Sequence, residues 1–255
     1  MLSIKDYVRQ EKEKLKEIVP KMAPMRLTII QVGDVEASNR YVRNKVHDCE
    51  EIGITAEVVH LDAEGLTSEK LQYLVDLYQN PVIVQLPLPK GVGTPIVDPI
   101  VDVDGFHPMS HFLPCTPGGI MDYLRAVGKA DGEGKFAVVI GRSDIVGKPM
   151  AKMLMAFNWT TAIVHSKTDE ALKDTLLKNA DLVVCAVGKD GFISSKDAPN
   201  AFIVDVGINF NEAGKLVGDV SIAPGDEERV TPVPGGVGLL TRLHLLKNVV
   251  SFYTR

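Results

Sequence analysis

Short apolar runs alternate with amphipathic stretches along the chain, and this alternation predicts a parallel α/β fold. Apolar runs rich in β-branched residues are typical of strands that a parallel sheet buries on both faces. Stretches with apolar residues at every third or fourth position predict the helices between them. Strands are expected at 26–32, 54–61, 82–88, 136–141, 161–165, 182–187 and 201–206, and helices at 4–19, 37–51, 67–78, 116–127, 149–157, 169–178 and 239–253.

The pattern is interrupted between residues 89 and 114, where four prolines precede Pro114 and no periodicity is sustained. This stretch predicts a long functional loop between two halves. A chain of 255 residues can form two domains of roughly 120 residues, each with its own core. We therefore expect two α/β domains flanking a cleft, one of residues 1–117 and 242–255 and a Rossmann-like one of residues 118–241.

Residues 135–149 join an apolar strand to a glycine-bounded polar turn and then to a helix. Gly141 permits a sharp turn, Gly147 allows close approach of the backbone, and Pro149 suits the first turn of a helix. Backbone N–H groups at such a helix start can face a phosphate. The spacing is neither the usual dinucleotide fingerprint nor a Walker loop, and Lys148 is followed by proline, which argues against ATP hydrolysis. An ordinary strand-to-helix turn is the alternative.

Composition excludes several classes of function. A net charge of −5 gives no reason to expect nucleic acid as partner, and the hydrophobic share of 45% argues against disorder. No apolar run approaches the roughly 20 residues of a membrane helix, and no signal peptide precedes the charged first helix, so we expect a cytoplasmic protein. The three cysteines, Cys49, Cys115 and Cys185, are far apart, which favours buried free thiols over disulfides or zinc. No metal site is expected.

Tyr41 and Lys45 lie four residues apart and therefore on one face of their predicted helix. A lysine that is partly desolvated beside an aromatic ring can donate or accept a proton near neutral pH. The alternative is a solvated lysine with an interfacial tyrosine. Gln85 lies in the apolar strand expected at 82–88, towards the carboxyl end, where α/β proteins form their sites. Asp104 lies on the following loop, where hydrogen bonding to a substrate is favoured over a metal because the calcium-loop spacing is absent.

Seven motifs occur in one order across nearly the whole chain, and together they resemble the bifunctional methylenetetrahydrofolate dehydrogenase/cyclohydrolase family. They are Tyr41-x-x-x-Lys45, VQLPLP at 84–89, DVDGFHP at 102–108, PCTP at 114–117, GRSDIVGKP at 141–149, DVG at 205–207 and TPVPGGVG at 231–238. The chain departs from the family pattern at three places: Val101 replaces a lysine, residues 110–113 form a shortened segment, and Leu239-Leu240 replaces Pro-Met.

The resemblance implies a folate substrate in the cleft and a nicotinamide cofactor on the second domain. It implies that Tyr41 stacks on the folate, that Lys45 is the central catalytic group held and tuned by Gln85, and that Asp104 hydrogen-bonds the pterin. Residues 231–241 would close over the nicotinamide side, with Gly238 and Thr241 contacting substrate. For the cofactor it implies binding by Gly141, Arg142, Ser143, Ser166 and Ile208. The family also suggests a homodimer through the cofactor domains.

The implied enzyme oxidises 5,10-methylenetetrahydrofolate and then hydrolyses the methenyl product to 10-formyltetrahydrofolate. A dehydrogenase-only relative and a noncatalytic nucleotide-binding regulator are the alternatives.

The choice of cofactor follows from the end of the strand 161–164. NAD-binding units usually carry a carboxylate there for the ribose 2′-OH, whereas this chain has His165, Ser166 and Lys167. Ser166 can donate to a 2′-phosphate and Arg142 can pair with it bidentately. We therefore expect NADP, with NAD possible. The alternative is that Arg142 and Lys167 are solvated surface charges.

Overall fold

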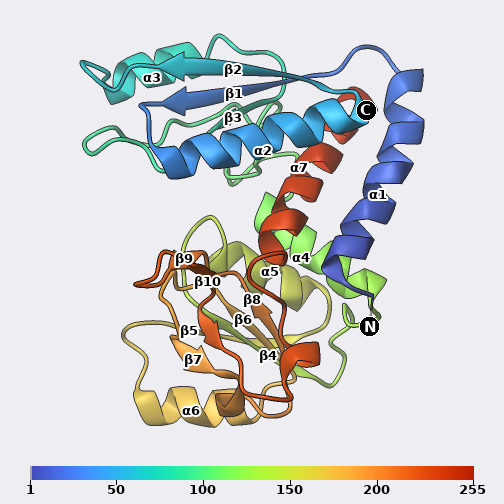
Figure 1. Ribbon diagram of the computed structural model, residues 1–255, viewed down its shortest axis with the longest axis vertical. Coiled ribbons are helices and arrows are strands. Elements are labelled where there is room, and N and C mark those ends of the chain that lie inside the picture. Colours follow the sequence, from blue (N-terminus) through green and yellow to red (C-terminus); the bar gives the residue numbers. More distant parts are fainter. Residues whose placement is uncertain (1) are drawn as a thin grey trace. The chain divides into compact units, whose positions relative to one another are not determined.

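The computed structural model describes residues 2–255, and the chain divides into two compact units (Figure 1). The four-stranded unit comprises the chain up to Val8 together with Thr116–Thr241. The three-stranded unit comprises Arg9–Cys115 and Arg242–Arg255. Both sheets that give the units these names are parallel, so the predicted α/β class is confirmed.

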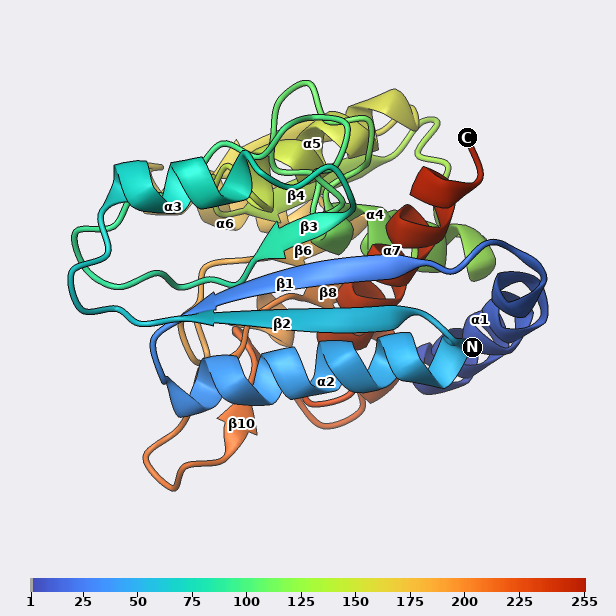
Figure 2. The same ribbon diagram turned by 90° about the horizontal axis from the view of Figure 1, so that it is seen from above.

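The sheet of the three-stranded unit has the order β2-β1-β3, with β1 at Arg26–Val32, β2 at Thr55–Leu61 and β3 at Val82–Val84. β1 is central because every residue after Arg26 is buried, whereas β2 forms a partly exposed edge. Helix α2 (Glu36–Ile52) runs along β2 (Figure 2), and α3 (Ser68–Val75) buries Leu71 and Val75 against the sheet. The Thr67 side chain caps α3 by accepting the backbone N–H of Lys70 at 3.3 Å.

The predicted strand 82–88 is too long. β3 ends at Val84, and the Leu86–Pro87 peptide is cis. Gln85 still donates its backbone N–H to the Ile30 carbonyl at 2.8 Å, but Pro87 and Pro89 have no N–H with which to continue the ladder. The stretch 89–114 then contains no helix and no strand, in agreement with the predicted loop.

The sheet of the four-stranded unit has the order β5-β4-β6-β8, with β5 on one side of β4 and β6 and β8 on the other, as in doubly wound α/β sheets. Its strands are β4 (Phe136–Ile140), β5 (Thr160–Val164), β6 (Leu182–Cys185) and β8 (Phe202–Asp205), and its helices include α5 (Gly147–Ala156) and α6 (Glu170–Lys178). Four two-residue strands were not predicted: β7 (Ile193–Ser194), β9 (Asn209–Phe210), β10 (Leu216–Val217) and β11 (Val220–Ser221). Strands of two residues are too short to show an alternating hydrophobic pattern.

Short 3₁₀ helices occur in both units, at Val19–Lys21 in the three-stranded unit and at Ser195–Asp197 and Glu227–Arg229 in the four-stranded unit.

Three helices contain or adjoin the points where the chain changes unit: α1 (Ile4–Ile18), α4 (Cys115–Ala126) and α7 (Val237–Tyr253). The division differs from the boundaries expected from the sequence at the N-terminus, because the residues up to Val8 group with the four-stranded unit. Tyr7 packs against Tyr123 with ring centroids 5.7 Å apart, and the Tyr123 hydroxyl donates to the Leu2 carbonyl at 2.8 Å. Between residues 2 and 255 no helix is long and apolar enough to cross a membrane.

Candidate active site

Helix α2 and the end of β3 bring together two of the predicted catalytic residues. Lys45 Nζ donates to Gln85 Oε1 at 3.0 Å, and Gln85 Nε2 donates to the Leu86 carbonyl at 2.6 Å. The second bond orients the amide so that its oxygen meets the ammonium group. Both side chains are half-buried, so the pair is accessible to a ligand while partly shielded from water.

Asp104 lies close to this pair and is buried on the loop that follows β3. Burial raises the pKa of Asp104, and the nearby positive charge of Lys45 and the Cys115 thiol act in the opposite direction. Asp102, two residues earlier, plays a different part, because its carboxylate accepts the N–H of Gly105 at 3.1 Å and of His107 at 2.7 Å. Asp102 therefore shapes the loop, and Asp104 is the carboxylate that stands beside the lysine.

Asn248 on α7 is a positioning residue that the sequence pattern did not reveal. Its buried amide donates to the carbonyls of Val103 at 2.9 Å and Leu113 at 3.0 Å, so it ties together both ends of the loop that carries Asp104. The Cys115 N–H in turn donates to the Asp104 carbonyl at 3.1 Å. An amide within an otherwise apolar helical face was the available signal, because a buried amide needs partners.

A buried ionic cluster supports the same face of α2. Asp48, one turn after Lys45, accepts Lys12 Nζ at 2.6 Å and a guanidinium nitrogen of Arg242 at 2.9 Å. Arg242 also affects the ionisation of Tyr41. Burial raises the pKa of the Tyr41 hydroxyl, and the positive charges of Arg40 and Arg242 offset only part of that rise. Tyr41 is half-buried, with both a ring surface and a hydroxyl to offer.

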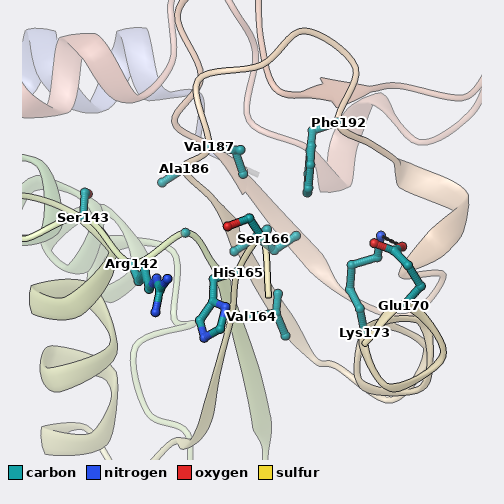
Figure 3. Close-up of a pocket in the computed structure, with 12 residues that line it drawn as sticks. Arg142, Ser143, Val164, His165, Ser166, Glu170, Lys173, Ala186, Val187 and Phe192 are labelled. Atoms are coloured by element: carbon teal, nitrogen blue, oxygen red, sulfur yellow. Dashed lines mark hydrogen bonds and ion pairs between the residues drawn. The ribbon is translucent and has the colours of Figure 1, made fainter. Parts of the chain in front are cut away.

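The four-stranded unit contains a pocket of about 350 Å³ at the carboxyl ends of β4, β5 and β6 (Figure 3). This is the edge of a parallel sheet where α/β proteins bind ligands. Its polar lining consists of Arg142, Ser143, His165, Ser166, Glu170 and Lys173, and its apolar lining includes Ile140, Val164, Ala186, Val187 and Phe192.

The turn after β4 shows why glycines stand at its two ends. Gly141 has φ of +113°, and a Cβ there would lie 2.3 Å from the Ala186 carbonyl oxygen. A Cβ on Gly147 would lie 2.3 Å from the Gly141 carbonyl oxygen. Helix α5 begins at Gly147, two residues earlier than expected, and Ser143 Oγ accepts the N–H groups of Val146 and Gly147 at 3.3 Å. The backbone thus closes into a compact loop at a helix N-terminus, which is suited to a phosphate.

The side chains of this pocket separate into two groups (Figure 3). Arg142 and His165 lie at one end, Ser166 lies between, and the ion pair of Glu170 with Lys173 lies at the other end. The sequence pattern did not single out Glu170, Lys173 or the Phe192 ring opposite them, although Glu170 brings a carboxylate into the pocket. Its charge is matched by Lys173, whose ammonium also lies 5.6 Å from the Phe192 ring centroid.

Three other predicted residues lie elsewhere in the four-stranded unit. Ile208 follows β8, is 44% exposed, and is not among the residues that line the pocket. Gly238 and Thr241 lie in the first turns of α7, where Thr241 Oγ1 and Thr116 Oγ1 share a hydrogen bond of 2.9 Å.

The three cysteines are buried and free, as expected. In the part of the chain that the structure describes, no group of three His, Cys, Asp or Glu side chains could hold a metal ion.

Comparisons with known proteins cover nearly the whole chain. The family model of the tetrahydrofolate dehydrogenase/cyclohydrolase catalytic domain matches residues 2–104. The family model of the tetrahydrofolate dehydrogenase/cyclohydrolase NAD(P)-binding domain matches residues 114–255. Bifunctional protein FolD of Brevibacillus brevis is 42% identical over 248 residues, covering 88% of this chain and 85% of that protein.

Solved structures agree. The FolD methylenetetrahydrofolate dehydrogenase/cyclohydrolase of Campylobacter jejuni superposes with a TM-score of 0.87 at 36% identity, covering 99% of this chain and 98% of that chain. The Trypanosoma brucei methylenetetrahydrofolate dehydrogenase-cyclohydrolase, complexed with NADP and an inhibitor, gives a TM-score of 0.87 at 29% identity, covering 100% and 97%.

Proposed function

The chain belongs to the tetrahydrofolate dehydrogenase/cyclohydrolase family, and we propose that its two activities depend on the Lys45–Gln85 pair with Asp104 and on the pocket around Arg142. The family, the fold class and the enzyme class expected from the motifs are confirmed by the comparisons. The protein oxidises 5,10-methylenetetrahydrofolate with NADP and hydrolyses the methenyl product. The roles of individual residues are the proposal, and the 3.0 Å bond between Lys45 and Gln85 carries it.

In the oxidation, the bridging carbon of the substrate gives up a hydride, which the nicotinamide accepts when it is bound. The carbon becomes part of an amidinium cation, so the residues must align the substrate and tolerate a developing positive charge. Asp104 is suited to hold the pterin because a carboxylate can accept hydrogen bonds from its amino and ring N–H groups. The ring of Tyr41, one turn from Lys45, is suited to stack on the folate.

In the hydrolysis, water adds to the methenyl carbon and loses one proton, which leaves a hydroxyl group on that carbon. The bond from the carbon to one folate nitrogen then breaks as the hydroxyl loses its proton to become the formyl C=O, and that nitrogen takes up a proton, so that one proton is released overall. Lys45 is the group that can move these protons, since its ammonium donates to Gln85 and stands near Asp104. Gln85 holds the lysine in a single orientation.

The residues of the pocket fit NADP. The tight turn at Gly141 and the N-terminus of α5 suit the pyrophosphate, and Arg142 with Ser166 suits the 2′-phosphate. Glu170 does not oppose this assignment because its carboxylate is already paired with Lys173. Ser143, which lines the pocket from the same turn, is proposed to contact the phosphates as well. Gly238, Thr241 and Ile208 stay as proposed contacts to substrate and cofactor.

The test is to measure both half-reactions with NAD⁺ and NADP⁺ in parallel. We expect reduced cofactor to form from methylenetetrahydrofolate, faster with NADP⁺, and the methenyl absorbance to decay when that compound is supplied alone. Reduction without decay would indicate a dehydrogenase-only enzyme, and neither signal would indicate a noncatalytic relative.

The setting of the enzyme is also proposed. We expect a cytoplasmic homodimer joined through the four-stranded units, serving one-carbon transfer to purine, methionine and histidine biosynthesis. Sedimentation equilibrium of the purified protein measures its oligomeric state, and a monomer mass would contradict the homodimer.

A further inference from the structure

Asp219 is a fully buried carboxylate with four hydrogen-bond donors in the four-stranded unit. Oδ2 accepts the backbone N–H of Val187 at 2.7 Å and of Gly188 at 3.0 Å, and Oδ1 accepts that of Lys189 at 2.8 Å. The fourth donor is Asn209 Nδ2, at 2.9 Å from Oδ1. Because hydrogen bonds to an ionised acceptor are stronger than those between neutral groups, this carboxylate fixes three successive residues of the loop after β6 and also Asn209, the first residue of β9.

A second buried carboxylate fixes Asp219 itself. Asp205, the last residue of β8, accepts through Oδ1 the backbone N–H groups of Gly207 and Asp219, both at 2.9 Å. Its Oδ2 accepts the N–H of Val220 at 3.0 Å. The segment that carries Asp219 is therefore attached to the end of a core strand, and Asp219 has little freedom to move with the loops that it holds.

The loops held by Asp219 lead directly to the cofactor pocket. Ala186 and Val187 line the pocket, and Val187 is the first residue whose N–H Asp219 accepts. The Ala186 carbonyl is also the atom that lies against the turn at Gly141. Asp219 itself is not among the lining residues, so any effect on the cofactor must pass through these backbone segments.

We infer that Asp219 is a positioning residue for the cofactor: it sets the wall at Ala186–Val187, and through it the turn at Gly141, before NADP binds. The inference rests on the proposed function, because it assumes that this pocket takes the cofactor. The binding energy of NADP is then not spent on ordering two loops, which is the advantage of a preorganised site.

The test is Asp219→Asn, which keeps the shape, removes the charge, and turns one accepting oxygen into an NH₂ group that faces N–H donors. We expect the KM for NADP⁺ and the Kd for NADPH, read from its fluorescence without folate, to rise by about tenfold or more, the size expected for losing a hydrogen bond to a charged group. Hydrolysis of the methenyl substrate without cofactor should keep its kcat within about twofold, because Lys45, Gln85 and Asp104 belong to the other unit.

Asp226→Asn is the matched control. Asp226 is a partly buried aspartate of the same unit that accepts Ser195 Oγ and the Arg229 guanidinium, both at 2.6 Å, and it does not line the pocket. Both variants should melt at lower temperature than the wild type, but only Asp219→Asn should weaken NADPH binding. If both raise the Kd equally, the role of Asp219 is merely structural and the inference is overturned.

Asn209→Ala decides the matter if Asp219→Asn does not fold. It removes one of the four donors, leaves the carboxylate with its three backbone partners, and should raise the Kd for NADPH by about threefold, with the methenyl hydrolysis unchanged. An unaltered Kd would overturn the inference. A wild-type protein that binds no NADPH would instead refute the proposed function, so the two failures are distinguishable.

Discussion

Replacing Lys45 by methionine tests the chemistry most directly. Methionine keeps much of the length and apolar volume of the side chain but has no amine, so the bond of 3.0 Å from Lys45 Nζ to Gln85 Oε1 is lost together with the titratable group. The positive charge that opposes the raised pKa of Asp104 also disappears. The pKa of Asp104 should therefore rise further in this variant, and folate binding should weaken more steeply than in the wild type as the pH falls.

The magnitude follows from the role. A lost general acid–base group costs about 10²–10⁴ in rate, which is about 3–5 kcal/mol in activation free energy. Hydrolysis of methenyltetrahydrofolate, followed by loss of its absorbance, should therefore fall at least about 10²-fold. Hydride transfer itself moves no proton, so the dehydrogenase rate at saturating substrate should fall much less. The two activities of one enzyme should separate.

Lys45→Arg is the matched variant. Arginine keeps the positive charge beside Asp104 but does not give up its proton near neutral pH. If Lys45 acts by proton transfer, this variant should hydrolyse as poorly as the methionine variant while binding folate better. Hydrolysis at the wild-type rate in the methionine variant would refute the role assigned to Lys45, and recovery in the arginine variant would reduce that role to charge alone.

Three further predictions address the remaining residues. Asp104→Ala should raise the KM for folate in both reactions and leave the Kd for NADPH nearly unchanged; loss of thermal stability with normal folate affinity would mean that Asp104 only shapes the loop. Arg142→Ala should raise the KM for NADP⁺ far more than that for NAD⁺, and equal effects on the two would remove the guanidinium from the 2′-phosphate. Burial raises the pKa of Asp205 to about 6, so the folded protein holds this proton more tightly than the unfolded chain; the resulting stabilisation, about 3 kcal/mol, is complete below about pH 4 and lost as the pH rises to 6. Denaturant titrations should show the difference in unfolding free energy between wild type and Asp205→Asn shrinking over that range, and a constant difference would contradict the assignment.

The hydrophobic pattern predicted the main strands and helices because most of them bury a regular set of apolar side chains. The prediction was wrong where the apolar pattern and the backbone hydrogen bonding disagree. The strand that begins at Val82 was predicted too long because Leu86 and Leu88 continue its apolar run, while Pro87 and Pro89 end the hydrogen-bond ladder. The residues up to Val8 were expected in the first domain, yet Tyr7 packs against Tyr123 and the Leu2 carbonyl accepts the Tyr123 hydroxyl. No local sequence pattern reveals contacts over such a distance.

The candidate site was predictable where a motif marks a chemical role, as for Lys45, Gln85 and Asp104. It was not predictable where a residue works through its neighbours. Glu170 and Lys173 read as ordinary polar positions of an amphipathic helix, and only the folded chain shows that their face meets a pocket. Asn248 and Asp219 likewise act by holding loops that are far from them in the sequence.

The three buried thiols allow local opening of the folded protein to be measured by cysteine labelling. Burial raises the pKa of Cys49 to about 12, and the pKa values of Cys115 and Cys185 are raised as well, so at neutral pH the native state presents almost no reactive thiolate. An alkylating reagent can therefore modify each cysteine only while its surroundings are open, and the labelling rate reports the free energy of that opening. Cys115 adjoins the loop of Asp104 and Cys185 ends β6, where the wall of the cofactor pocket begins. Added folate should slow the labelling of Cys115, and added NADP⁺ should slow that of Cys185. Each native cysteine therefore reports the local opening of one binding region without an introduced probe.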